Sequence, residues 1–173
     1  SITLEDVNCE NCIDAKGLYL MPGFIDLHCH GGDGSEFIDG TEEAVIKACS
    51  IHAKHGTKVL YPTISATDYD TMVKSLEAIE KAKDSANIVI AGVHLEGPFI
   101  AAAHKGAQPL EYVVKPCVKT FDEYNAASGN TIKIVSLAPE TEGAEEKKTT
   151  KKAAGKKTAA KKSPAKKTTT RKN

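Results

Sequence analysis

The stretch PGFIDLHCHGG, residues 22–32, carries the most informative pattern in this 173-residue chain. Its apolar run breaks off at Gly31 and Gly32, which is typical of a buried strand that enters a loop. The apolar residues of the run are Leu20, Met21, Phe24, Ile25 and Leu27. Because side chains alternate along a strand, we expect Asp26, His28 and His30 on one face. The other face then carries Ile25, Leu27 and Cys29.

Two imidazoles at the carboxyl end of one strand are a pair of ligands that suits a divalent metal. The alternative for His28 and His30 is burial, with each ring bonded to backbone carbonyls. Asp26 is expected to support the histidines rather than to act as a base. His52 and His55 fall on a helix and beside a turn, where we expect structural roles.

The rest of the chain alternates between helix and strand patterns. Apolar residues spaced three and four apart predict helices, and continuous apolar runs predict strands. The expected helices span 41–55, 68–83 and, broken by Pro116, 111–128; the further strands span 59–63, 88–95 and 132–137. Such alternation predicts an α/β fold with a parallel sheet and helical crossovers. Four βα units form an incomplete (β/α)8 TIM barrel, and a flavodoxin-like sheet is the alternative.

The neutral overall charge conceals two unlike parts of the chain. Residues 1–146 carry a net charge of −12 and residues 147–173 carry +12. No large apolar residue follows Leu137, so the basic tail is expected to be disordered. Five irregularly spaced cysteines, Cys9 and Cys12 among them, favour reduced thiols and a cytoplasmic location. No apolar run approaches the roughly 20 residues of a membrane span.

Polar side chains follow the ends of two predicted strands. His28 and His30 end the first strand, and Glu96 follows the strand at 88–95, with His94 one layer deeper on the same face. Because the carboxyl ends of parallel strands meet on one side of such folds, we expect His28, His30 and Glu96 to converge. Two imidazoles and one carboxylate form a partial ligand set for Zn²⁺ or Fe²⁺.

Four motifs occur in order: PGFIDLHCHGG, HGTKVLYPTIS, GVHLEGPFI followed by KGAQP, and SLAPE. They span residues 15–143 and resemble the N-acetylglucosamine-6-phosphate deacetylases, a family of the amidohydrolase superfamily. The resemblance implies a (β/α)8 barrel with a small β-sandwich. It also implies an enzyme that hydrolyses the N-acetyl amide of a sugar phosphate, with a divalent metal, Zn²⁺ or Fe²⁺, to polarise the carbonyl and activate water.

Carried over position by position, the resemblance makes Glu96 a metal ligand through its LEGP motif. His28 and His30 match the pair that holds a second metal in members with both histidines. Ala107 and Gln108 match the loop that contacts the sugar; many members have His in place of Gln108, and an amide still hydrogen-bonds a hydroxyl. The family's later metal-binding histidines and its general-base aspartate have no counterpart here. We therefore assign no catalytic residue and expect the chain alone to lack deacetylase activity.

The expected organisation has three parts. They are a remnant of the β-sandwich at 1–20, a partial barrel at 21–143 and a disordered Lys-rich tail at 144–173. A half-barrel exposes unpaired strand edges, which favours a homodimer or a second chain that completes the barrel. Three functions stay open at this point: a sugar deacetylase fragment, a nucleic-acid-binding protein and a non-catalytic barrel partner.

The tail resembles the Lys-rich tails of linker histones. Its positive charge predicts nonspecific, salt-sensitive binding of nucleic acid. The alternative is a solubilising or accidental appendage.

Overall fold

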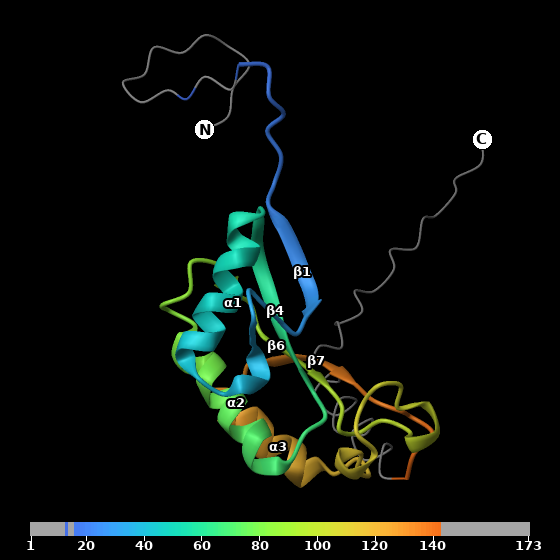
Figure 1. Cartoon of the computed structure of the whole chain (residues 1–173). Helices are drawn as coiled ribbons and strands as arrows, with labels where there is room; N and C mark the ends of the chain where they lie inside the picture. Colours follow the sequence, from blue (N-terminus) through green and yellow to red (C-terminus); the bar gives the residue numbers. More distant parts are fainter. Residues whose placement is uncertain (1–12, 14–15, 143–173) are drawn as a thin grey trace, which may run out of the picture.

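The computed structural model describes residue 13 and residues 16–142 (Figure 1). Most of the β-sandwich remnant expected at 1–20 therefore lies outside the described residues, and the tail expected at 144–173 lies wholly outside them. Both stay predictions, as does nucleic-acid binding by the tail.

Strands and helices alternate along the described chain as expected of βα units. The strands are β1 (Phe24–Cys29), β2 (Gly31–Gly32), β3 (Ser35–Glu36), β4 (Thr57–Ser65), β5 (Val89–Ile90), β6 (Val93–Glu96) and β7 (Ile132–Ser136). The α-helices are α1 (Glu42–Lys54), α2 (Tyr69–Ala82) and α3 (Val118–Ala127). Three short 3-10 helices complete the list: η1 (Phe37–Asp39), η2 (Ala102–His104) and η3 (Leu110–Tyr112).

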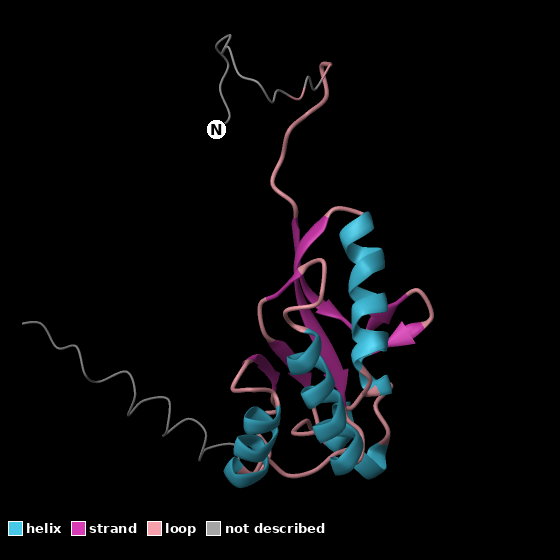
Figure 2. Ribbon diagram, turned by 90° about the vertical axis from the view of Figure 1, so that its left-hand side faces the viewer, coloured by secondary structure: helices cyan, strands magenta, loops and turns pink. Residues whose placement is uncertain are grey.

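The main sheet is parallel and runs in the order β1-β4-β6-β7, with β5 paired to β4. Each long strand therefore lies beside the one that precedes it in sequence. The three helices cover one face of this sheet (Figures 1 and 2). A sequential order with helices on one side belongs to a partial (β/α)8 barrel, whereas a flavodoxin-like sheet doubles back and is covered on both faces. The predicted fold class is confirmed and the flavodoxin-like alternative is wrong.

Side-chain caps determine where α1 and α2 begin. The hydroxyl of Thr41 accepts the Ala44 N–H at 3.2 Å, and the carboxylate of Asp68 accepts the Thr71 N–H at 2.9 Å. Each cap satisfies one of the backbone donors that a helix leaves unpaired at its start. The helices predicted at 41–55 and 68–83 are accordingly found almost at those bounds.

The core lies between the sheet and the helical layer. Its fully buried side chains include Leu60, Ile64, Leu76, Ile79, Leu95 and Phe99. Burial of each such side chain contributes roughly 1.5–3 kcal/mol relative to exposure. Helix α2 packs against both α1 and α3, so the layer is continuous. None of the helices within residues 16–142 is long and apolar enough to cross a membrane.

Strand β1 is more exposed than its apolar sequence predicts. Phe24, Ile25 and Leu27 are 57%, 64% and 55% exposed. The reason is position: β1 is an edge of the sheet, and within residues 16–142 the sheet pairs it with β4 alone. The prediction of a buried first strand is therefore wrong for these residues, while Val93 and Leu95 of β6 are buried as expected.

The strand predicted at 88–95 is divided into β5 and β6. Between them the backbone of Gly92 passes so close to Thr131 that an added Cβ would lie 2.8 Å from the Thr131 carbonyl oxygen. The loop expected after β1 also contains structure, since β2 and β3 form an antiparallel hairpin. Its turn residues, Asp33 and Gly34, both have positive φ, which is the pattern of a two-residue hairpin turn.

Candidate metal centre

Three side chains with metal-binding atoms meet at the carboxyl ends of β1 and β6. The ligand atoms of His28, His30 and Glu96 all lie within 4.8 Å of one another. Nε2 of His30 is 3.1 Å from Oε2 of Glu96, and the rings of His28 and His30 meet edge to face with centroids 4.9 Å apart. The structure thus brings the three predicted ligands together, and metal binding by them stays a prediction.

Strand β4 lies between β1 and β6 and links their polar ends. In the strand register Ser65 of β4 pairs with Glu96, and Thr63 pairs with His94. The Ser65 hydroxyl donates to Oε2 of Glu96 at 3.3 Å and lies 3.4 Å from Nδ1 of His30. Sequence reasoning missed both β4 residues. Their signal is the polar alternation of Thr63 and Ser65 at the end of an otherwise apolar run.

His94 supports the centre from one layer below. Its Nδ1 is 3.3 Å from Nδ1 of His28, and its Nε2 is 3.0 Å from the hydroxyl of Ser136 on β7. A metal bound through Nε2 of His28 requires the proton of that ring on Nδ1, where His94 Nδ1 can accept it. Burial, and next the charge of His28, lower the pKa of His94, which favours the neutral imidazole that this role needs.

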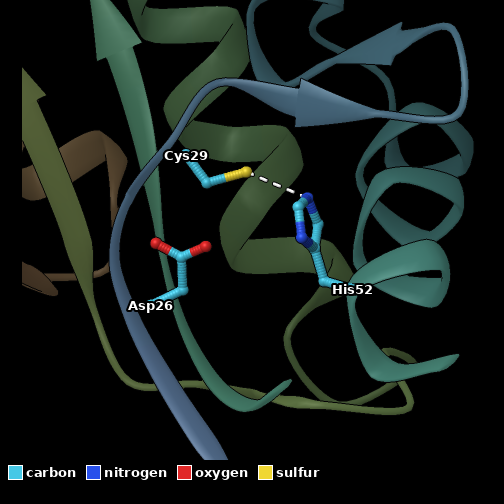
Figure 3. A group of neighbouring side chains, drawn as sticks. All are labelled: Asp26, Cys29 and His52. Atoms are coloured by element: carbon cyan, nitrogen blue, oxygen red, sulfur yellow. Dashed lines mark hydrogen bonds between the residues drawn. The ribbon is translucent and has the colours of Figure 1, made fainter. Parts of the chain in front are cut away.

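The prediction that Asp26 shares a face with His28 and His30 is wrong. The register of β1 against β4 shifts between Asp26 and Cys29, so an extra residue interrupts the alternation of side chains. The Asp26 carboxylate instead groups with Cys29 and His52, with their ligand atoms within 4.8 Å of one another (Figure 3). Its contact with the histidine pair goes through backbone, since Oδ1 accepts the His28 N–H at 3.0 Å.

The side-chain amide of the loop residue Gln108 hydrogen-bonds the backbone at the ends of β4 and β6 through both its oxygen and its nitrogen. Its Oε1 accepts the Ala66 N–H at 2.6 Å, and its Nε2 donates to the Glu96 carbonyl at 2.9 Å. Gln108 therefore holds the loop against the backbone that carries Glu96. Ala107 beside it is exposed. Contact of Ala107 and Gln108 with a sugar stays a prediction.

A hollow of about 250 Å³ opens beside the centre. It is lined by His30, Glu36, Ile38, Thr63 and Ser65. Glu36 and Ile38 belong to β3 and η1, the elements that the sequence predicted only as loop. The hollow places open space next to the candidate ligands, as a site for a polar ligand requires.

The donor set fits a divalent transition metal. Two imidazole nitrogens and one carboxylate oxygen are ligands that Zn²⁺ and Fe²⁺ accept, and in catalytic sites they leave positions open for water or substrate. His28 lies on β1 and His30 directly follows that strand. Glu96 of β6 is oriented by the hydroxyl of Ser65 on β4, the strand between β1 and β6. Hydrogen bonds that orient ligands in this way are a common feature of metal sites.

Comparisons with known proteins identify the family to which the chain belongs. Residues 19–167 match the amidohydrolase family. N-acetylglucosamine-6-phosphate deacetylase of Lysinibacillus sphaericus is 33% identical over 132 residues, which cover 74% of this chain and 34% of the relative. The enzyme of that name from Caenorhabditis elegans is 34% identical over 157 residues, covering 83% of this chain and 36% of the relative. The chain thus spans about a third of the length of these relatives.

Solved structures of proteins with the same name are similar to this chain in fold. The crystal structure of N-acetylglucosamine-6-phosphate deacetylase from Pasteurella multocida superposes with a TM-score of 0.71 at 26% identity, covering 82% of this chain and 38% of that one. The Mycobacterium smegmatis enzyme gives a TM-score of 0.69 at 27% identity, covering 78% and 38%. One relative from Escherichia coli O157:H7, 32% identical over 127 residues, is an N-acetylgalactosamine-6-phosphate deacetylase.

Proposed function

This chain belongs to the amidohydrolase family, and on that premise we propose that it serves the hydrolysis of the N-acetyl amide of an amino-sugar 6-phosphate. The observation that carries the proposal is the convergence of His28, His30 and Glu96 at the strand ends of a partial barrel. The activities for which its relatives are named support N-acetylglucosamine 6-phosphate as the substrate, with the galactosamine epimer as a related one.

His28, His30 and Glu96 would hold the divalent metal. When bound, a divalent metal polarises the amide carbonyl and lowers the pKa of a bound water toward neutrality. Around it each protein group has a separate task. Ser65 donates to Glu96 and so fixes the direction of the carboxylate. With the proton of His28 on Nδ1, His94 would accept it and Nε2 of His28 would be left to hold the metal.

The loop at Gln108 has the task of placing the substrate. Because Gln108 bonds the Ala66 N–H and the Glu96 carbonyl, the loop is anchored to the two strand ends that border the centre. Ala107 is held at the surface beside it. An amide oxygen has two lone pairs, so Gln108 keeps acceptor capacity for a sugar hydroxyl while it bonds Ala66.

We also propose that this chain by itself releases no acetate. Within residues 16–142 the centre groups two histidines and one glutamate as ligands. A water-activating reaction needs in addition a general base within hydrogen-bond reach of the attacking water. We propose that the residues of this chain do not supply such a base; the chain spans about a third of the length of its relatives.

Metal binding tests the first proposal. Zn²⁺ is titrated by calorimetry into a variant with Cys9→Ser, Cys12→Ser, Cys29→Ser and Cys117→Ser, which leaves buried Cys49 as the single remaining thiol. We expect one equivalent of Zn²⁺ to bind and Glu96→Gln to abolish that binding, whereas His104→Asn, which changes an exposed histidine on η2, leaves it intact. Equal binding by the Glu96→Gln and His104→Asn variants would contradict the centre.

An acetate-release assay tests the second proposal. Purified chain loaded with Zn²⁺ or Fe²⁺ is mixed with N-acetylglucosamine 6-phosphate, and acetate is measured enzymatically. We expect no release above the metal-only control. Release that disappears in the Glu96→Gln variant would show that this chain is sufficient for hydrolysis.

A further inference from the structure

A second group of metal-binding side chains lies between β1 and α1, outside the centre described above. It consists of Asp26 and Cys29 from β1 and His52 from α1, with one ligand atom of each residue within 4.8 Å of the others. In Figure 3 the sulfur of Cys29 points at the His52 ring, and the Asp26 carboxylate lies beside the same strand. The register shift in β1 creates this group, because it brings Asp26 to the side of Cys29.

Three polar atoms at this place lie within hydrogen-bond distance of one another, and they have fewer protons than contacts. Sγ of Cys29 is 3.0 Å from Nε2 of His52, and the Gly31 carbonyl oxygen is 3.2 Å from Sγ and 3.0 Å from Nε2. A thiol and a neutral imidazole supply at most two protons along these three short contacts, and the carbonyl supplies none. At least one of these protons must therefore be shared between two acceptors, which makes each of the two bonds weaker than an unshared one.

We propose that Asp26, Cys29 and His52 bind a second divalent cation that prefers sulfur, such as Zn²⁺. A bound cation would remove the need to share a proton, because the thiolate sulfur of Cys29 and the imidazole nitrogen of His52 would both direct lone pairs at the cation. Thiolate, imidazole and carboxylate are the three ligand types of protein zinc sites, with bonds of about 2.0–2.3 Å. For a tetrahedral ion these bond lengths place sulfur and nitrogen about 3.5 Å apart, so the 3.0 Å contact opens by about half an ångström.

The second site would hold an edge strand to the helical layer. Strand β1 pairs with β4 alone among the described strands, and its apolar residues are largely exposed. Cys29 lies between His28 and His30 in sequence, so a bond from Cys29 to a cation shared with α1 fixes the segment that carries both imidazoles. This assigns His52 a ligand role, where its place on a helix predicted only a structural one.

Cobalt spectroscopy tests the site with the full-length chain. The protein carries Cys9→Ser and Cys12→Ser, so that its remaining thiols are Cys29, Cys49 and Cys117. Co²⁺ is added stoichiometrically, and the sulfur-to-cobalt charge-transfer band in the near ultraviolet reports thiolate ligation. We expect the band to appear and to be lost in Cys29→Ser and in His52→Gln.

Two controls separate this site from the rest of the protein. Cys117→Ser, at an exposed thiol just before α3, should leave the band unchanged, as should Glu96→Gln, which alters a centre without sulfur. Added Zn²⁺ should abolish the band in the parent. It should also raise the melting temperature more in the parent than in Cys29→Ser, where only the centre of His28, His30 and Glu96 is left to bind the ion. Absence of the band in the parent, or its persistence in Cys29→Ser, would overturn the proposal; circular dichroism of each variant shows that the helices are retained.

Discussion

Replacement of Thr63 by Val tests how β4 supports the histidine segment of β1. The Thr63 side chain is fully buried, and its hydroxyl accepts the Cys29 N–H at 3.1 Å. Valine has nearly the same shape but no hydroxyl, so the backbone N–H between His28 and His30 loses its partner. A backbone donor left unsatisfied in this way costs about 1–3 kcal/mol.

The measurement is urea unfolding followed by circular dichroism. With a slope of about 2 kcal/mol/M, which is typical of small proteins, the loss shifts the midpoint down by about 0.5–1.5 M. The matched control is Thr67→Val, because the Thr67 hydroxyl donates to the exposed carboxylate of neighbouring Asp68. That variant should stay within about 0.5 kcal/mol of the parent.

The same substitution should weaken metal binding at His28, His30 and Glu96. Loss of a residue that orients metal ligands usually lowers affinity by about 10- to 100-fold. Thr63→Val should therefore raise the calorimetric dissociation constant for Zn²⁺ by about that factor, with Thr67→Val unchanged. If Thr63→Val matched the parent in both stability and Zn²⁺ affinity, the support assigned to β4 would be refuted.

Three further predictions concern burial and charge. Burial, and next the charge of Cys29, raise the pKa of Cys49 to about 12, so at neutral pH iodoacetamide should label exposed Cys117 and spare Cys49, and equal labelling by peptide mass spectrometry would contradict this. Leu60→Ala removes a fully buried core side chain and should cost about 2–5 kcal/mol in urea unfolding, whereas Leu110→Ala, at an exposed residue, should cost under about 0.5 kcal/mol. The hydrogen bond from the Thr71 N–H lowers the pKa of Asp68, so its stabilising effect is present above the aspartate pKa of the unfolded chain and is lost as pH falls through the folded value. Asp68→Asn should accordingly lose less stability than the parent between about pH 7 and about pH 3, and identical losses would refute this account of the α2 cap.

Sequence periodicity predicted most of the fold because its signals are local. The apolar spacing of α1 and α2 and the caps Thr41 and Asp68 act within one or two turns, so the bounds follow from the sequence. The continuous apolar runs of β4 and β6 likewise predicted buried parallel strands. The convergence of Glu96 with His28 and His30 followed from one rule, that parallel strands end on the same side.

The features that the sequence did not reveal depend on contacts between distant residues. Exposure of Phe24, Ile25 and Leu27 follows from the edge position of β1, which an apolar run does not encode. The face of Asp26 depends on a register shift against β4, and strict alternation assigns it wrongly. Gln108 bonds both Ala66 and Glu96, and Ala66 lies 42 residues before it in the sequence. Composition gives no sign of a contact between residues so far apart.

The central claim is that His28, His30 and Glu96 share one divalent ion. The most direct test is an anomalous difference map, collected at the zinc absorption edge, from crystals of the chain grown with Zn²⁺. The account predicts a peak about 2.0–2.2 Å from an imidazole nitrogen of each histidine and from a carboxylate oxygen of Glu96, and no peak there in Glu96→Gln crystals. A map with no peak among these three side chains, or with the same peak after Glu96→Gln, would contradict it.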